Sequence, residues 1–182
     1  MTQWKNKKIF FVGIILLVGL LISACTQAKM EDQNEKVIQK VLELQFSGPD
    51  EKLIDLMWNP KYKVVENGVE KNPEFEKYAK EVYGDYFTEN ELDIFMRTFG
   101  TSYQSLAHTN NYNLSFEGIS IKKIEKNPNH YEFTAQVGYN KGDGQDGTTE
   151  AEGTILFSTE EKGKIGRFEY KNNSELLDKL SK

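Results

Sequence analysis

Near its start the chain has an apolar run that is preceded by lysines and followed by the only cysteine. We expect the residues up to this cysteine to take no part in the fold of the remaining chain. Three lysines precede the run Ile9–Ile22, and two small residues separate it from Cys25. That order is typical of a secretory signal peptide. Fourteen helical residues span only about 21 Å, whereas a helix needs about 20 residues to cross ~30 Å of hydrocarbon. We therefore expect residues 1–24 to be a cleaved signal peptide, with an uncleaved membrane anchor as the alternative.

The end of this run, Ile22-Ser23-Ala24-Cys25, resembles the lipobox of bacterial lipoprotein precursors. The resemblance implies that Cys25 becomes the mature N-terminus and carries a diacylglycerol, with a further acyl chain such as palmitate in some bacteria. Two or more chains hold a protein firmly, at about 0.8 kcal/mol per buried methylene. The implied location is the extracytoplasmic face of the cell membrane, with residues 25–33 as lipidated N-terminus and tether. An ordinary signal peptide followed by an accidental cysteine is the alternative.

The remaining 158 of the 182 residues are enough for one domain, which we expect over residues 34–182. All 28 acidic residues but only 20 of the 23 basic residues lie after residue 24, which gives this part a net charge of −8. Such a balance argues against nucleic acid as a partner and against electrostatic binding to anionic lipid. Because there is no second cysteine, the fold must rest on an apolar core.

Apolar residues at helical spacing predict four helices, near residues 34–46, 50–58, 73–86 and 88–99. Thr88 and Glu91 have the spacing of a capping box at the start of the fourth helix. Between the second and third helices, Asn67-Gly68 favours a type I′ turn, so we expect a small hairpin over Tyr62–Glu70. Residues 101–111 are polar, and we expect them to form a connector.

Strict alternation from Tyr131 to Tyr139 predicts the clearest strand of the chain. In the strand before it, the apolar residues change parity between Phe116 and Ile119, which predicts a β-bulge near Gly118. Further strands are expected near residues 151–157 and 165–170, followed by a short helix with Leu176 and Leu180. The result is an α+β fold, with N-terminal helices packed on one face of a curved four-stranded antiparallel sheet.

This order of elements, with its bulged sheet, resembles the NTF2-like superfamily, also called SnoaL-like or cystatin-like, over about Asn34 to Tyr170. The resemblance implies a cone with a cavity between helices and sheet. Members include isomerases, dehydratases, assembly modules and extracytoplasmic accessory domains, so the fold does not select a function.

Aromatic residues on faces that we expect to point inward are candidates for lining such a cavity and binding a small apolar ligand. They are Trp58, Tyr62, Tyr78, Phe95, Phe116, Tyr131 and Phe133. The same spacing is also typical of plain core residues, which is the more common role of such side chains.

Ketosteroid-isomerase-type members of the superfamily pair a carboxylate base with a tyrosine or protonated acid. No Asp or Glu falls on an inward face of the predicted strands, since Glu117, Glu132, Glu150 and Glu152 have the solvent parity. We therefore assign no catalytic residue. His108 and His130 lie in a connector and a turn without the partners of a metal site, so we expect neither a metal nor a cofactor.

Two hypotheses remain. The first is a membrane-anchored, non-catalytic binding or accessory module whose partner is an envelope protein or a small apolar ligand. The second is a small-molecule isomerase or lyase of the SnoaL-like type. A buried Asp or Glu beside Tyr78 or Tyr131 would favour the second hypothesis.

Overall fold

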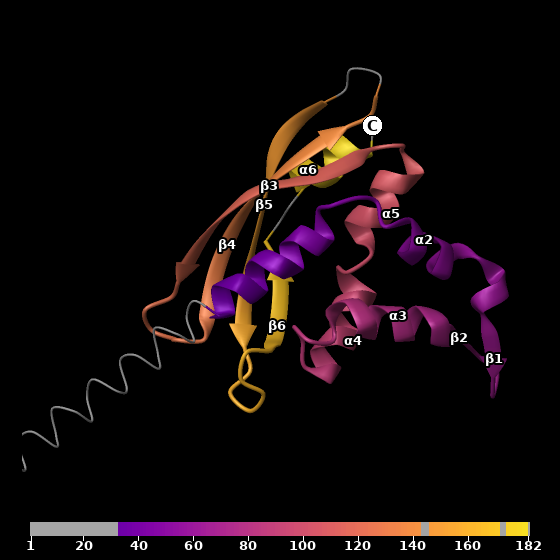
Figure 1. Ribbon diagram of the computed structural model, residues 1–182, viewed down its shortest axis with the longest axis horizontal. Coiled ribbons are helices and arrows are strands. Elements are labelled where there is room, and N and C mark those ends of the chain that lie inside the picture. Colours follow the sequence, from indigo (N-terminus) through magenta and orange to yellow (C-terminus); the bar gives the residue numbers. More distant parts are fainter. Residues whose placement is uncertain (1–32, 143–145, 172–173, 182) are drawn as a thin grey trace, which may run out of the picture.

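Helices and strands follow one another in nearly the predicted order in the computed structural model, which describes residues 33–142, 146–171 and 174–181 (Figure 1). The helices are residues 33–45, α2 (Glu51–Trp58), α3 (Pro73–Tyr83), α4 (Glu89–Thr98), α5 (Ser102–Thr109) and α6 (Ser174–Leu180), with a 3₁₀ turn, η1 (Pro60–Tyr62). The strands are β1 (Val64–Glu66), β2 (Val69–Lys71), β3 (Asn113–Lys123), β4 (His130–Asn140), β5 (Asp146–Phe157) and β6 (Ile165–Tyr170). The α+β class with a four-stranded antiparallel sheet is confirmed.

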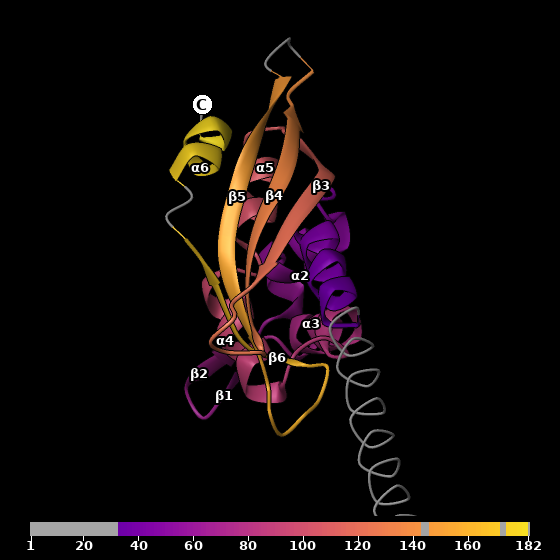
Figure 2. The same ribbon diagram turned by 90° about the vertical axis from the view of Figure 1, so that its left-hand side faces the viewer.

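The main sheet has the order β3-β4-β5-β6, with every neighbouring pair antiparallel. Figure 2 shows its long strands side by side, with β3 on the outer side. Alternate residues of β4 are buried, as the sequence predicts. In β3 the register shifts between Phe116 and Gly118, so that Glu117 is an extra residue. The predicted bulge is confirmed, and it turns Ile119 and Ile121 toward the face that carries Leu114 and Phe116.

The helix of residues 33–45 lies across one face of the sheet, and Ile38, Val41 and Leu42 on its inner side are fully buried. The side-chain amide of Asn34 donates to the Tyr131 hydroxyl at 3.3 Å, which fixes the first turn of the helix over the start of β4. Gln33, which the sequence assigned to the tether, is already helical.

The end of this helix and the start of α2 are joined by one buried side chain, Gln104 of α5. Its Nε2 donates to the carbonyls of Leu44 and Gln45 at 3.1 and 2.9 Å, and its Oε1 accepts from the Asp50 N–H at 2.6 Å. Gln104 thus satisfies backbone groups that two helix ends would otherwise leave unpaired. The expectation of a connector over residues 101–111 was wrong, because Tyr103, Gln104 and Ala107 form a narrow inner face of a helix.

An aromatic core joins α3 and α4 to β6. Phe87 stacks on Phe95 with ring centroids 4.5 Å apart, and Phe95 meets Phe168 of β6 edge to face at 5.0 Å. Phe87 also forms a parallel bridge with Ile165, which covers the outer edge of β6. Helix α3 ends at Tyr83, so Tyr86 follows the helix that was expected to contain it.

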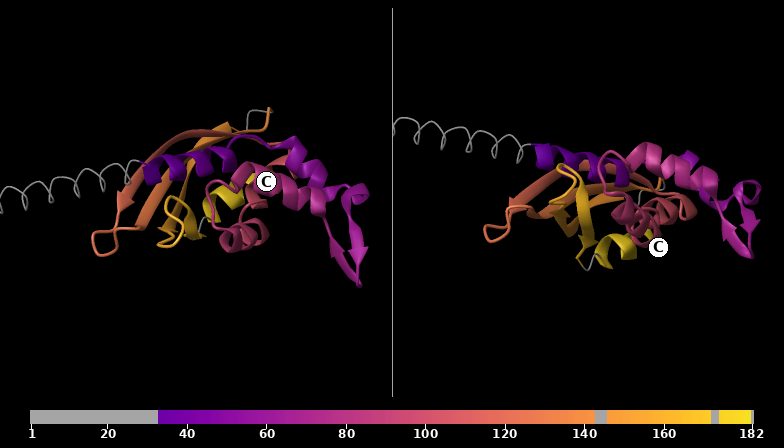
Figure 3. Two further views of the ribbon diagram at one scale, coloured as in Figure 1. Left: turned by 60° about the horizontal axis from the view of Figure 1, so that its bottom comes forward. Right: turned by 90° about the horizontal axis from the view of Figure 1, so that it is seen from below.

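The β1–β2 hairpin projects from the body of the molecule, at the end opposite the start of helix 33–45 (Figure 3). Asn67 and Gly68 both have positive φ, 54° and 77°, as a type I′ turn requires. The hairpin is confirmed, although every residue of its two strands is exposed.

The predicted signal peptide (residues 1–24), Cys25 and the tether up to residue 32 lie outside the described residues. Among the helices that the structure does describe, none has the length and apolar character needed to cross a bilayer.

Candidate functional site

The seven aromatic residues proposed as a cavity lining do not meet in one place. Phe95, Tyr131 and Phe133 are at most 2% exposed and pack in the core. Trp58 is 61% exposed, so the expectation that it points inward was wrong: α2 buries Leu56 instead, and its last residue lies beyond the core. Tyr62 lies on the surface beside α2, with its hydroxyl donating to Asp55 at 3.0 Å.

The other two, Tyr78 and Phe116, line a common open groove of about 690 Å³ between helix 33–45, α3 and β3. Lys40, Glu43 and Leu44 form its helical wall, and Asp50 lies at its end. The groove combines apolar rings with charged side chains, as small-molecule sites commonly do.

Asp50 and Tyr78 are paired within this groove. The Tyr78 hydroxyl donates to Asp50 Oδ2 at 2.8 Å, while Asp50 Oδ1 accepts from the Leu53 N–H at 3.0 Å and caps α2. Partial burial and the adjacent carboxylate raise the pKa of Tyr78 to about 12, so the phenol remains a proton donor. The ammonium of Lys52 lies 4.2 Å from the centre of the Tyr78 ring. Sequence reasoning missed this pair because 28 residues separate its members.

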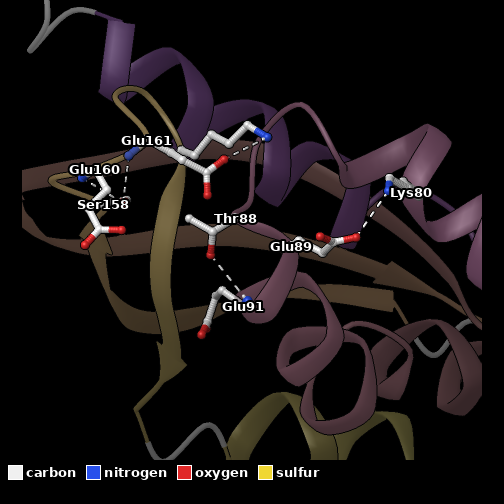
Figure 4. Close-up of polar contacts among 8 residues, drawn as sticks. Lys80, Thr88, Glu89, Glu91, Ser158, Glu160 and Glu161 are labelled. Carbon is white, nitrogen blue, oxygen red and sulfur yellow. Dashed lines mark hydrogen bonds and ion pairs between the residues drawn. The ribbon is translucent and has the colours of Figure 1, made fainter.

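A second carboxylate is more deeply buried than Asp50. Glu91 is only 4% exposed, and its Oε1 accepts the backbone N–H of Phe168 in β6 at 2.7 Å. Burial raises the pKa of Glu91, while the Phe168 hydrogen bond opposes that shift. Sequence reasoning found Glu91 only as half of a capping box. Thr88 does cap α4, accepting the Glu91 N–H at 3.3 Å, but Figure 4 shows the Glu91 carboxylate turned away from Thr88, toward β6.

The carboxylate of Glu91 therefore has a structural partner and no neighbouring tyrosine hydroxyl bonded to it. It occupies the position that a backbone carbonyl would have if another strand lay beside β6. Glu91 therefore caps the outer edge of β6. Asp50 is the acidic residue that lines the groove together with Tyr78.

A third feature is the set of exposed apolar side chains Trp58, Val64, Val65 and Val69, which we call the hairpin surface. These are four of the six large apolar side chains that are exposed in the described part of the chain, and Val65 reaches 73%. The register pairs Val64 with Lys71 and Glu66 with Val69, so Val64 and Val69 share one face of the hairpin, and Val65 lies on the other. Charges around the valines are paired, Lys63 with Glu70 at 2.9 Å and Lys71 with Glu66 at 2.6 Å. What remains for a partner at this end is apolar contact.

Trp58 also lines an open pocket of about 570 Å³ with Ile54 of α2 and with His108 at the end of α5. His108 Nδ1 lies 3.6 Å from the Glu51 carboxylate. Within the described ranges, no group of three or more His, Cys, Asp or Glu side chains is placed to hold a metal ion.

No protein-family model and no curated protein sequence matches this chain. Among solved structures, it is similar to the NMR solution structure of TraH, a proposed transfer protein from the Gram-positive conjugative plasmid pIP501. The two share 16% sequence identity with a TM-score of 0.45, over 79% of this chain and 95% of that chain.

Proposed function

We propose that this chain is a lipid-anchored, extracytoplasmic binding module of a bacterial envelope, with its NTF2-like domain tethered through Cys25 and its partner bound at the hairpin surface. The observation that carries the proposal is the exposure of Val64 and Val69 on one face of the β1–β2 hairpin and of Val65 on the other. This hairpin projects at the end of the molecule opposite the start of helix 33–45 (Figure 3).

The direction of that surface selects the kind of partner. Seven residues, 26–32, separate Cys25 from helix 33–45, and an extended chain covers at most ~3.6 Å per residue, so the helix starts under ~30 Å from Cys25. A lipid on Cys25 would keep the start of the helix near the bilayer and direct the hairpin away from it. An exposed apolar surface that faces away from lipid is typical of a site that binds another protein.

The hairpin also has the construction of a recognition element. Its strands are exposed on every residue, so their valines contribute little to the core and are free to bury area against a partner. Tryptophan is among the side chains that most often carry the binding energy of an interface, and the exposed valines add apolar area that is worth ~25 cal/mol per Å² when it is buried.

Affinity capture from crosslinked cells tests this function. Wild type is compared with the double variant Val64→Ser/Val69→Ser, whose two positions share one face of the hairpin, and with Ile94→Ser, which removes an exposed apolar side chain of α4 instead. We expect a partner protein that is enriched with wild type and Ile94→Ser and lost with the double variant. Equal enrichment with all three proteins would reject the hairpin surface as the binding site.

A second candidate function is suggested by the Asp50–Tyr78 pair, since a carboxylate beside a phenol is the arrangement that the isomerase or lyase alternative requires. In that function Asp50 would remove a proton next to a carbonyl, and Tyr78 would donate to the resulting enolate oxygen. Both oxygens of Asp50 are already occupied by hydrogen bonds, so a substrate must displace the Tyr78 hydroxyl first.

Exchange of the α-hydrogens of cyclohexanone with deuterated water, followed by NMR, tests this second function. Asp50→Asn keeps an oxygen to cap α2 but cannot act as the base. Exchange by wild type that falls at least tenfold in Asp50→Asn would support catalysis. Exchange at the same rate in both proteins would exclude it for this class of substrate.

A further inference from the structure

The outer edge of β3 presents unpaired backbone groups. Leu114 directs its N–H and C=O outward, since both bond to Gly48, at 2.6 and 3.1 Å. Outward and inward groups alternate along an antiparallel strand, and the bulge at Glu117 advances the alternation by one residue. Phe116, Ile119 and Ile121 therefore also direct their backbone groups outward. None of these three has a backbone partner on that side among the residues that the structure describes.

A hydrogen bond at the end of β3 shows the same assignment of inward and outward backbone groups. The N–H of Ile124 donates to the carbonyl of His130 at 2.9 Å, which places the inward-facing groups at even positions beyond the bulge. Ile119 and Ile121 are odd, so their groups face away from β4.

The opposite edge of the sheet is closed. Ile165 of β6 donates to the Tyr86 carbonyl at 2.7 Å and accepts from the Thr88 N–H at 3.0 Å. One turn further along α4, the Glu91 carboxylate takes up the N–H of Phe168. The β6 edge of the sheet is thus covered by backbone and by a buried carboxylate, whereas the β3 edge is left open. Open strand edges are common sites of association between chains.

Helix 33–45 leaves the middle of this edge accessible. Its first turn is fixed over β4 through Asn34 and Tyr131, and the chain reaches the edge of β3 only at Gly48, beside Leu114. Ile119 and Ile121, lying between those two points, pack against the core but remain partly exposed. An additional strand alongside them would cover that exposed area and pair the free backbone groups.

We propose that the occupant of this edge is a second copy of the same chain, whose β3 runs antiparallel to the first about a two-fold axis at Ser120. The sequence Ile119-Ser120-Ile121 is self-complementary in that arrangement. Ile119 faces Ile121 of the second copy, and both outward backbone groups of each residue are used, giving four hydrogen bonds. On the opposite face of the sheet, the Glu117 carboxylate reaches inward and accepts from the Thr148 hydroxyl of β5 at 3.0 Å, so it takes no part in the pairing.

Ser120 gives this pairing a sharp test, because the two copies of Ser120 meet on the axis. There the residues form a pair without mutual hydrogen bonds, with Cα atoms about 4.5 Å apart, which is within the range of a disulfide. Ser120 is exposed on β3, and so is Ser115, on the same face but on the other side of the bulge. Ser115→Cys is therefore a matched control that lies away from the axis.

The full chain is expressed in cells as Ser120→Cys, Ser115→Cys or the parent with Cys25 alone, and membranes are oxidised and analysed on non-reducing gels. We expect a band of twice the monomer mass for Ser120→Cys, at least fivefold stronger than for Ser115→Cys or the parent. Equal amounts of dimer for the two cysteine variants would overturn the proposal.

Two changes in the Ser120→Cys background then test the mechanism. Ile119→Pro removes an outward N–H without removing a bond to β4, so it should abolish the dimer band, whereas Ile119→Ala, which loses similar packing, should retain it. A band that survives Ile119→Pro would exclude pairing through this edge.

Discussion

Glu91 shows how one carboxylate can stand in for a neighbouring strand. It is buried, it accepts a single backbone N–H from Phe168, and burial raises its pKa above the ordinary value of 4.5. A group whose pKa is raised in the folded state favours folding most below its ordinary pKa. That contribution is lost as the pH rises through the folded-state pKa.

We therefore expect Glu91→Gln, which keeps an acceptor oxygen without the charge, to be at least as stable as wild type at neutral pH. Its stability relative to wild type should increase as the pH rises above about 4.5. Glu91→Ala should lose about 1–3 kcal/mol, because Phe168 is left with a buried unpaired N–H. Urea unfolding at several pH values measures these differences. Exposed Glu89 supplies the control, Glu89→Gln, and a Glu91→Gln difference that is independent of pH would contradict the assignment.

Gln104 is the second side chain whose removal should lower the stability of the whole fold, because it bonds to the backbone of two other helices. Gln104→Ala leaves the carbonyls of Leu44 and Gln45 and the N–H of Asp50 without their partner, which we expect to cost about 2–4 kcal/mol from the hydrogen bonds and the cavity together. Gln39→Ala removes an exposed contact to Glu43 and should change stability by less than about 0.5 kcal/mol. Thermal unfolding of both variants gives the comparison, and similar losses in both would show that Gln104 does not join the two helices.

Among the elements, the β1–β2 hairpin combines a demanding turn with little contribution to the core. Gly68 has a φ of 77° but open space around the position of a Cβ atom. Gly68→Ala should therefore strain the turn by about 1 kcal/mol and loosen the hairpin without lowering the global free energy of unfolding. Amide exchange should accelerate in β1 and β2 only. Gly118→Ala, at a position with equally open space and no positive φ, should leave exchange in β3 unchanged; global destabilisation by Gly68→Ala would mean that the hairpin belongs to the core.

Elements with a regular apolar period could be predicted from the sequence. The alternation in β4 and the change of parity before Ile119 gave the strand and the bulge, because each depends on neighbours along the chain. Helix α5 was missed because its inner face contains Gln104 and Ala107, which carry little apolar signal. Trp58 was misplaced because helical spacing shows which residues share a face but not how far the core extends along it.

The candidate site was less predictable than the fold, for a physical reason. The Asp50–Tyr78 pair and the contact of Glu91 with β6 join residues 28 and 77 positions apart. No local period encodes such pairs, since they arise from the packing of whole elements. The acidic residues of the long strands lie on the solvent face, as their positions along each strand predict. The two acids near the core, Asp50 and Glu91, come instead from the starts of α2 and α4.

For the molecule as a whole, the decisive prediction concerns its anchor. If Cys25 carries the lipid, Cys25→Ala should move most of the protein from the membrane fraction to the soluble or secreted fraction, because the lipid is lost and the net negative charge after residue 24 disfavours binding to anionic lipid. Ser23→Thr, which changes a neighbouring residue of the signal, is a control for expression. Membrane retention of Cys25→Ala would indicate instead that Ile9–Ile22 is an uncleaved span.

The bulge at Glu117 has a consequence for how the length of this chain can change over evolutionary time. Deleting Glu117 would restore a regular strand and send Ile119 and Ile121 to the opposite face, exchanging them with Ser120 and Lys122. A gap of one codon there is thus equivalent to several simultaneous substitutions of apolar by polar residues. Lineages that descend from this protein should gain and lose residues at the Asn67-Gly68 turn, while the spacing from Leu114 to Ile121 stays constant.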